Sequence, residues 1–243
     1  MKILDLPFRL RERRLFGFLD DFEWFLSPHL WTSFNTGSGG AGVAVASGAA
    51  AFGGILQLTT GATAGNEAAI GSTSAPFLPQ ARCPLVFETL LQYAEAASNK
   101  ANLFAGFSDS VNLTGQMQAG NAGPKASFNG FGIYKQGGTT VWACITSKGT
   151  TQTITPSQVS SLSATQQSLR MEIQEIDSAN AEVAFFVNGQ QLLDVNNRPI
   201  KQIVNFTAFA SLMAGVYVQA GAAASEVVSV DYVAAYQQRL AFQ

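Results

Sequence analysis

The sequence predicts an all-β protein, and three observations support this. Charged residues make up only 12% of the 243 residues, whereas hydrophobic residues reach 47%. Stretches in which apolar and polar residues alternate, the pattern of half-buried antiparallel strands, recur along the chain. Turn residues, many of them glycine, separate these stretches at intervals of roughly 8 to 15 residues. This composition excludes a disordered chain and argues against a helical bundle.

The strand signals follow one another in chain order. Residues 84–93 and 169–174 alternate most clearly, with Leu169 on one face and Arg170 on the other. Asn188-Gly189 lies between two such stretches and supplies the positive φ angles that a tight hairpin turn requires. Further strands are expected at residues 54–60, 102–107, 128–134, 139–146, 212–218 and 227–236. A single helical turn is expected at Thr155-Pro156-Ser157-Gln158, because Thr caps and Pro suits the first helical position.

Residues 1–18 differ in composition from the rest of the chain. Positions 1–14 hold five basic and two acidic residues (+3), and the other 229 residues hold nine basic and fourteen acidic (−5), which sums to −2. We therefore predict an N-terminal arm over residues 1–18 and one β-sandwich domain over 19–243. The arm is either a first strand with solvated arginines or an extended segment that docks on an acidic partner. The docking residues would be Phe8, Arg9, Arg11, Arg13, Arg14, Leu15 and Phe16.

Several short motifs occur in an order that resembles a known family. They are Asp20-Asp21-Phe22 before Trp24 or Trp31, Gly53–Gly61, Pro84–Glu88, Gly106–Asp109, Gly130–Ile133, Phe185–Gly189 and Val230–Val233. This order, over residues 20–240, resembles the concanavalin A-like jelly roll, in the laminin-G-like form found in phage structural proteins. The resemblance implies two packed antiparallel sheets of about six strands each. Such a fold serves many functions and does not fix one.

Catalytic groups are not expected. Relatives of this fold include glycan hydrolases, which need an acid and a second carboxylate about 5.5 Å apart, as alternate residues of one strand can supply. Here Glu172 is followed two residues later by Gln174, and Glu175 is followed by Asp177 but then by Ala179, so the carboxylate series is broken in both registers. The single histidine, His29, leaves little room for imidazole chemistry. We predict no enzyme and no catalytic residue.

Neither a metal nor a cofactor is expected. The plausible calcium ligands form no Asp-x-Asp-x-Asp series; they are Asp20, Asp21, Glu23, Glu67, Asp109 and Asp231. Cys83 and Cys144 either pair in an oxidising compartment or remain buried thiols. Three tryptophans and five tyrosines could stack on sugar rings if they are exposed, or pack in the core.

The first functional interpretation is a virion structural protein. The net charge excludes a strongly basic nucleic-acid binder, no apolar run is long enough to span a membrane, and charges interrupt any signal-peptide core. Low-charge surfaces rich in Thr, Ser, Asn and Gly suit permanent packing. We expect a phage capsid decoration (cement) protein on the outer capsid surface, a homo-oligomer and specifically a trimer, bound to the major capsid protein. The alternative is a carbohydrate-binding module of a tail fibre or tail tip that recognises a host glycan. A glycan-cleaving enzyme is the third hypothesis.

Overall fold

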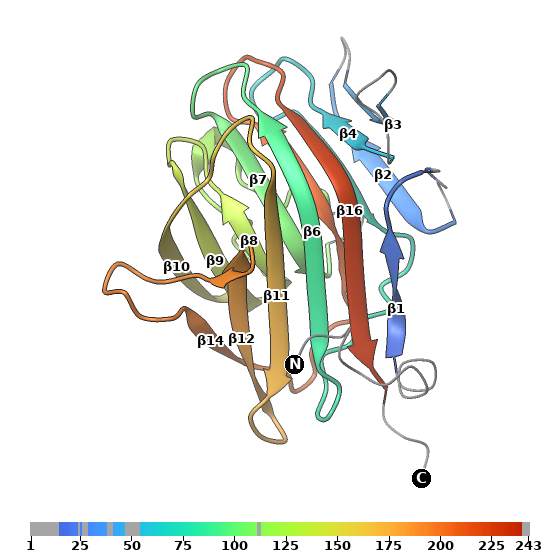
Figure 1. Ribbon diagram of the computed structural model, residues 1–243, viewed down its shortest axis with the longest axis vertical. Coiled ribbons are helices and arrows are strands. Elements are labelled where there is room, and N and C mark those ends of the chain that lie inside the picture. The colour runs from blue at the N-terminus through green and yellow to red at the C-terminus, as the bar shows by residue number, and fades with distance from the viewer. Residues whose placement is uncertain are drawn as a thin grey trace.

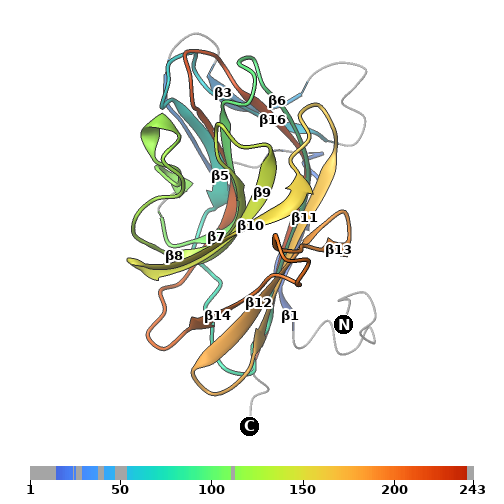
Figure 2. The same cartoon turned by 90° about the vertical axis from the view of Figure 1, so that its left-hand side faces the viewer.

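The computed structural model describes residues 15–23, 25, 29–37, 41–46, 54–110 and 113–239. Two antiparallel sheets face each other across an apolar core, as Figures 1 and 2 show. The predicted all-β sandwich is thus confirmed. A short 3-10 helix, η3 (Ala119–Asn121), lies between two strands. Among the described residues, no helix is long and apolar enough to cross a bilayer.

One sheet has nine strands, more than the six expected. Its main order is β13 (Gln190–Gln191), β12 (Asn180–Val187), β11 (Gln167–Glu175), β6 (Leu85–Ala94), β16 (Val227–Gln238), β4 (Leu56–Thr59) and β3 (Gly42–Val45). In addition, β14 (Lys201–Asn205) pairs with β12, and β1 (Leu15–Asp20) pairs with β16. The long strand β16 accommodates both neighbours because β4 pairs with its first half and β1 with its second half (Figure 1).

The second sheet has seven strands and is covered on both faces. Its order is β10 (Thr151–Ser160), β9 (Val141–Gly149), β8 (Phe128–Lys135), β7 (Ala101–Ser108), β15 (Met213–Ala220), β5 (Glu67–Ser72) and β2 (Trp31–Asn35). Its inner face contributes Phe107 and Trp142 to the main core. On its outer face, Phe104 and Tyr217 pack with Leu113 in a second apolar cluster. Among the described residues, this cluster covers part of the outer face of the seven-stranded sheet, whereas the outward-facing side chains of β6 and β11 in the nine-stranded sheet are partly exposed.

One expectation from the sequence is wrong, and one open alternative is decided. The helical turn at Thr155–Gln158 does not form, because these residues belong to β10, whose pairing with β9 shifts register between Pro156 and Ser160. Proline is tolerated there because β10 is an edge strand and its missing N–H breaks no ladder. Cys83 and Cys144 are both buried and are not joined by a disulfide.

The predicted boundary between arm and domain falls inside β1. Residues 15–18, assigned to the arm, pair with β16 in the nine-stranded sheet. Phe16 and Phe18 point into the sandwich, where Phe16 contacts Phe77 (ring centroids 5.7 Å apart) and Phe18 contacts Trp31 (5.1 Å). Their burial explains why this segment is a strand. Residues 1–14 lie outside the described residues, so the role of the basic arm remains a prediction.

Candidate ligand-binding groove

A groove of about 360 Å³ lies on the outer face of the nine-stranded sheet, at the ends of β1, β6, β11 and β16. Its lining mixes apolar, amide and charged side chains: Leu15, Arg82, Pro84, Leu85, Val86, Glu172, Ile173, Gln174, Glu175, Tyr236 and Gln238. Its size falls in the range of small-ligand sites. The lower ends of the four strands mark its position in Figure 1.

Strand register places the central residues of the groove side by side. Tyr236 of β16 lies opposite Val86 of β6, and Val86 lies opposite Glu172 of β11. All three alternate with buried residues and therefore face outward. In β16 this depends on a bulge, because its pairing with β6 shifts between Val230 and Tyr232. Before the bulge, the even-numbered residues Val228 and Val230 face the core. The extra residue at the bulge reverses the alternation, so that the even-numbered Tyr232 and Tyr236 face outward.

The polar groups beside the groove are held by one another. The Arg170 guanidinium lies 3.1 Å from a Glu172 oxygen (Nη2 to Oε1) and 4.5 Å from the Phe186 ring centre. The Tyr232 hydroxyl donates to Glu88 at 2.7 Å. Burial raises the pKa of Tyr236, so its phenol stays protonated near neutral pH. The groove thus combines one aromatic ring with oriented hydrogen-bond donors and acceptors.

The two carboxylates of the groove are already engaged. Glu172 is paired with Arg170, and Glu175 accepts the Arg82 backbone N–H at 2.6 Å. A glycan hydrolase needs one carboxylic acid that presents its proton to the leaving group, and neither contact prepares such a group. Asp177 lies beyond the end of β11 in a turn, where it accepts the Ala179 and Asn180 N–H groups at 2.8 Å each. The Asn180 side-chain amide also donates to Asp177 at 2.9 Å, and this bond, followed by the two backbone bonds, lowers the pKa of Asp177.

The candidate calcium ligands are dispersed. Asp20 ends β1 and accepts hydrogen bonds from Phe22 N and the Trp31 indole, Asp109 holds Asn129, and Glu67 accepts Gly115 N. Asp231 lies at the bulge of β16. Within the described part of the chain, no three His, Cys, Asp or Glu residues are grouped as a metal would require. The single histidine, His29, is exposed in the turn before β2.

Most aromatic candidates for sugar stacking are inside the protein. Trp31, Trp142, Tyr93 and Tyr217 are fully buried, and Tyr134 is buried apart from a small exposed fraction. Tyr232 and Tyr236, by contrast, lie on the open outer face. Trp24 lies outside the described residues.

The predicted docking residues have different positions. Leu15 lines the groove, whereas Phe16 faces the core side and carries the Arg239 guanidinium 5.1 Å from its ring centre. The others, Phe8, Arg9, Arg11, Arg13 and Arg14, lie outside the described residues. Sequence reasoning missed Tyr236, Gln174 and Gln238 as groove residues.

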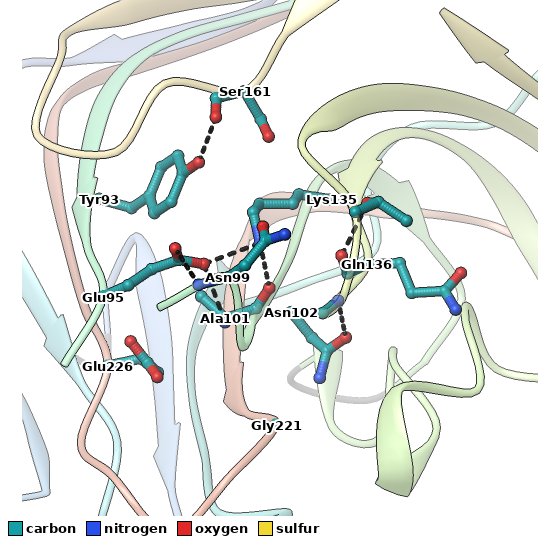
Figure 3. A network of polar contacts seen from close by, with 12 residues as sticks. Tyr93, Glu95, Asn99, Ala101, Asn102, Lys135, Gln136, Ser161, Gly221 and Glu226 are labelled. Atoms are coloured by element: carbon teal, nitrogen blue, oxygen red, sulfur yellow. Dashed lines mark hydrogen bonds and ion pairs between the residues drawn. The ribbon is translucent and has the colours of Figure 1, made fainter. Parts of the chain in front are cut away.

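A second polar cluster lies at the other end of the sandwich and is buried (Figure 3). Lys135 Nζ is 2.8 Å from Glu95 Oε1, with exposed side-chain fractions of 1% and 8%. Glu95 also accepts the N–H groups of Asn99 and Ala101 at 2.8 and 3.0 Å, which fixes the connection between β6 and β7. Glu226 accepts Ala96 N at 3.1 Å, but its Oε1 is buried without a hydrogen-bond partner. Burial raises the pKa of Glu226, and the nearby negative charge of Glu95 adds to this. Hydrogen bonds from the backbone and the positive charge of Lys135 lower the pKa, but the net shift is upward.

Comparison with solved structures supports the fold. A protein of unknown function from Shewanella oneidensis MR-1 has a TM-score of 0.60 and 16% identity, covering 95% of this chain and 89% of that one. Peanut lectin has a TM-score of 0.54 and 11% identity, covering 94% and 99%. An endo-1,3-beta-glucanase from Streptomyces sioyaensis has a TM-score of 0.58 and 15% identity, covering 93% and 97%.

These likenesses show that the chain adopts the lectin-like, concanavalin A-like jelly-roll sandwich. At such low identities they show the fold alone, and the glucanase shows that this fold also serves enzymes. No protein-family model and no curated protein matches the chain.

Proposed function

We propose that the protein is a non-catalytic saccharide-binding module. The observation that carries this proposal is the groove in which Tyr236 stands among Glu172, Gln174 and Gln238. An aromatic ring packs against the C–H face of a pyranose, as it does against other apolar surfaces. Planar amide and carboxylate groups beside it can bond neighbouring hydroxyls. A lectin and a glucanase among the similar structures agree with this ligand class.

Replacing Tyr236 with alanine is expected to weaken saccharide binding by about tenfold, because one stacking contact contributes roughly 0.5–1.5 kcal/mol beyond its buried area. A glycan array identifies the ligand, and titration calorimetry then measures the affinity. Tyr232→Ala is the matched control, because Tyr232 lies on the same face of β16 but outside the groove lining. Silence of the wild-type protein on the array, or equal losses in both variants, would contradict the proposal.

A second candidate function is favoured by the position of β1. The core contacts of Phe16 and Phe18 anchor the chain where the basic segment ends, and Leu19 on the same strand is 60% exposed. A decoration protein that grips a shell through a basic arm needs such an anchored attachment point. In this proposal the protein is a homotrimer on the outer surface of a phage capsid, bound to the major capsid protein.

Replacing Arg9, Arg11, Arg13 and Arg14 together by glutamine is then expected to lower affinity for assembled capsids by at least a hundredfold. Charge-assisted contacts contribute about 1.5–3 kcal/mol each where desolvated and much less at a wet rim. Co-sedimentation with capsids that lack the protein measures this. Equal binding by the variant and the wild-type protein would show that the arm does not mediate capsid binding. If neither protein bound, the proposal that the protein is a capsid decoration protein would be wrong.

A further inference from the structure

The buried cluster at the end of the sandwich opposite the groove holds one cation and two carboxyl groups. Lys135 Nζ lies 2.8 Å from Glu95, whereas Glu226 is completely buried and forms no ion pair with any described residue. Figure 3 shows Glu226 beside Glu95. Because Lys135 and Glu95 already neutralise each other, an ionised Glu226 would be a surplus negative charge without solvent. Burying an unpaired carboxylate costs so much free energy that such groups bind a proton instead.

The hydrogen bonds of Glu226 agree with a neutral carboxyl group. Its Oε2 accepts the Ala96 N–H at 3.1 Å, and its Oε1 is buried without a hydrogen-bond partner. A proton on Oε1 would remove the charge from the oxygen that no donor stabilises. Burial raises the pKa of Glu226, and the Glu95 charge adds to this. The side chains of Glu95, Lys135 and Glu226 together carry no net charge only when Glu226 is protonated.

The other titratable groups near Glu226 do not change this balance. Tyr93 of β6 has the Lys135 ammonium 5.7 Å from its ring centre, and burial raises the pKa of Tyr93 to about 12, so it stays uncharged near neutral pH. Lys100, in the connection between β6 and β7, is partly exposed and forms no ion pair with Glu226. Thr60, directly after β4, accepts the Glu226 backbone N–H at 2.9 Å and carries no charge.

Glu226 also fastens the connection between β6 and β7, residues 95–100. It does so through the Ala96 N–H, and the chain just before Glu226 holds the same connection, because Gly221 N donates to the Lys100 carbonyl oxygen at 3.0 Å. Water can therefore reach the Glu226 carboxyl group only if this connection moves. Ionisation of Glu226 and movement of the connection are thus expected to occur together.

We propose that this end of the sandwich is a pH-sensitive switch, in which protonated Glu226 holds the 95–100 connection closed and loss of its proton opens it. The proton passes to solvent water, and the carboxylate is then hydrated in the opened cluster. Since Glu226 binds its proton more tightly in the closed form, the closed form is favoured at low pH and loses stability as pH rises. The groove lies at the other end of the sandwich, so the switch does not depend on saccharide binding.

The release of one proton sets the size of the effect. The opening equilibrium constant should rise by up to about tenfold per pH unit between the ordinary carboxyl pKa, which applies to the open form, and the raised pKa of Glu226 in the closed form. Above the raised value it should be constant, because Glu226 is then ionised in both forms.

Hydrogen exchange of the full-length protein between pH 4 and pH 8, followed by mass spectrometry of peptides, tests the proposal. The reporter peptide covers residues 94–102, in which the Ala96 N–H donates to Glu226. The reference peptide covers residues 169–175 of β11, which pairs with a strand on each side and reports global unfolding. Protection factors are corrected for the base-catalysed rise of the intrinsic exchange rate with pH.

Two variants distinguish Glu226 from other carboxylates. Glu226→Gln keeps the shape of the side chain but cannot ionise. Glu182→Gln is the matched control, because it removes a partly exposed carboxylate that pairs with Lys201 at 2.7 Å. From pH 4 to pH 8 we expect the protection of residues 94–102, relative to the reference peptide, to fall by about tenfold or more in the wild-type protein and in Glu182→Gln. In Glu226→Gln it should stay nearly constant.

A flat profile of the wild-type protein would overturn the proposal, even if Glu226→Gln failed to fold. A fall of the same size in Glu226→Gln would also overturn it, because another group would then be responsible. If the reference peptide lost protection to the same extent, the whole sandwich would be unfolding and the proposal of a local switch would be wrong. None of these readouts involves a saccharide, so failure here and failure of the proposed function are distinguishable.

Discussion

Replacing Lys135 with methionine is expected to lower the free energy of unfolding by about 3–5 kcal/mol, the usual cost of removing one partner from a buried ion pair. Lys135 lies 2.8 Å from Glu95 and is almost completely buried, and Glu226 shares the same cluster. Methionine keeps most of the side-chain volume, so the loss reports on the ammonium group, which pairs with Glu95 and also donates to the Ala101 carbonyl oxygen at 3.0 Å. Two buried carboxylates would then lack a cation. Urea unfolding measures the difference, and a loss below about 1 kcal/mol would show that the pair contributes little.

Glu226→Gln serves as the opposing control. The pKa of Glu226 is raised in the folded protein, mainly by burial. A carboxyl group whose pKa is higher in the folded than in the unfolded protein binds a proton more readily when folded. Its contribution to the free energy of unfolding is therefore fully present below the unfolded-state pKa and is lost as pH rises through the folded-state pKa. We therefore expect wild-type and Glu226→Gln proteins to be equally stable near pH 4. As pH rises towards 8, the variant should become the more stable of the two. Adding Glu226→Gln to Lys135→Met should recover part of the loss, whereas a further loss would mean that Glu226 is a favourable partner.

The strands that sequence predicted well are those in which local pattern and burial agree. In β6 and β11, buried and outward-facing positions alternate, and most of the buried positions are apolar, as the sequence pattern predicted. The hairpin at Asn188-Gly189 is confirmed for the same reason, since both residues have positive φ (51° and 75°). Local chemistry alone determines these features.

Tyr236 could not be placed from sequence because its orientation depends on a bulge. Strict alternation from Val228 and Val230 would put Tyr232 and Tyr236 in the core. The register shift after Val230 reverses this, and the local signal is Asp231, the single charged residue of β16. Assembly of the groove further requires four strands from distant parts of the chain, an order that no local pattern contains.

The Glu95–Lys135–Glu226 cluster was missed for a related reason. Each residue lies at a strand end, where a charge ordinarily contacts solvent. They meet only because β6, β8 and β16 come together at one end of the sandwich, across both sheets. The packing of the sheets, rather than the residues themselves, makes these charges buried.

The predicted arm is four residues too long, because it extends to residue 18 whereas β1 begins at Leu15. The basic run ends at Arg14, and Phe16 and Phe18, which face the core, follow it directly. Gly17 allows β1 to approach β16, since a Cβ there would lie 2.1 Å from the Ala235 carbonyl oxygen. A glycine between two inward-facing phenylalanines therefore marks a strand, and its removal should damage the sandwich.

Deleting residues 1–18 is expected to lower the free energy of unfolding by about 3 kcal/mol or more, the lower estimate for two partly buried phenylalanines. The deletion removes most of β1 and leaves the second half of β16 as an exposed edge. Deleting only residues 1–14 keeps Phe16 and Phe18 in place and should cost much less. Denaturant unfolding of both truncated proteins beside the full-length chain measures the two losses.

The double variant Phe16→Ala/Phe18→Ala in the full-length chain separates packing from chain length. Both rings contact Phe77, and Phe18 also meets Trp31 edge-on, so their loss opens a space against the main core. The variant should reproduce most of the loss seen on deleting residues 1–18, because it keeps the β1 backbone but not its buried rings. If the deletions of residues 1–14 and 1–18 cost the same, β1 would contribute nothing to the sandwich and the whole of residues 1–18 would be an arm. A large loss on deletion with little effect of the double variant would instead place the stabilisation in the β1–β16 backbone hydrogen bonds.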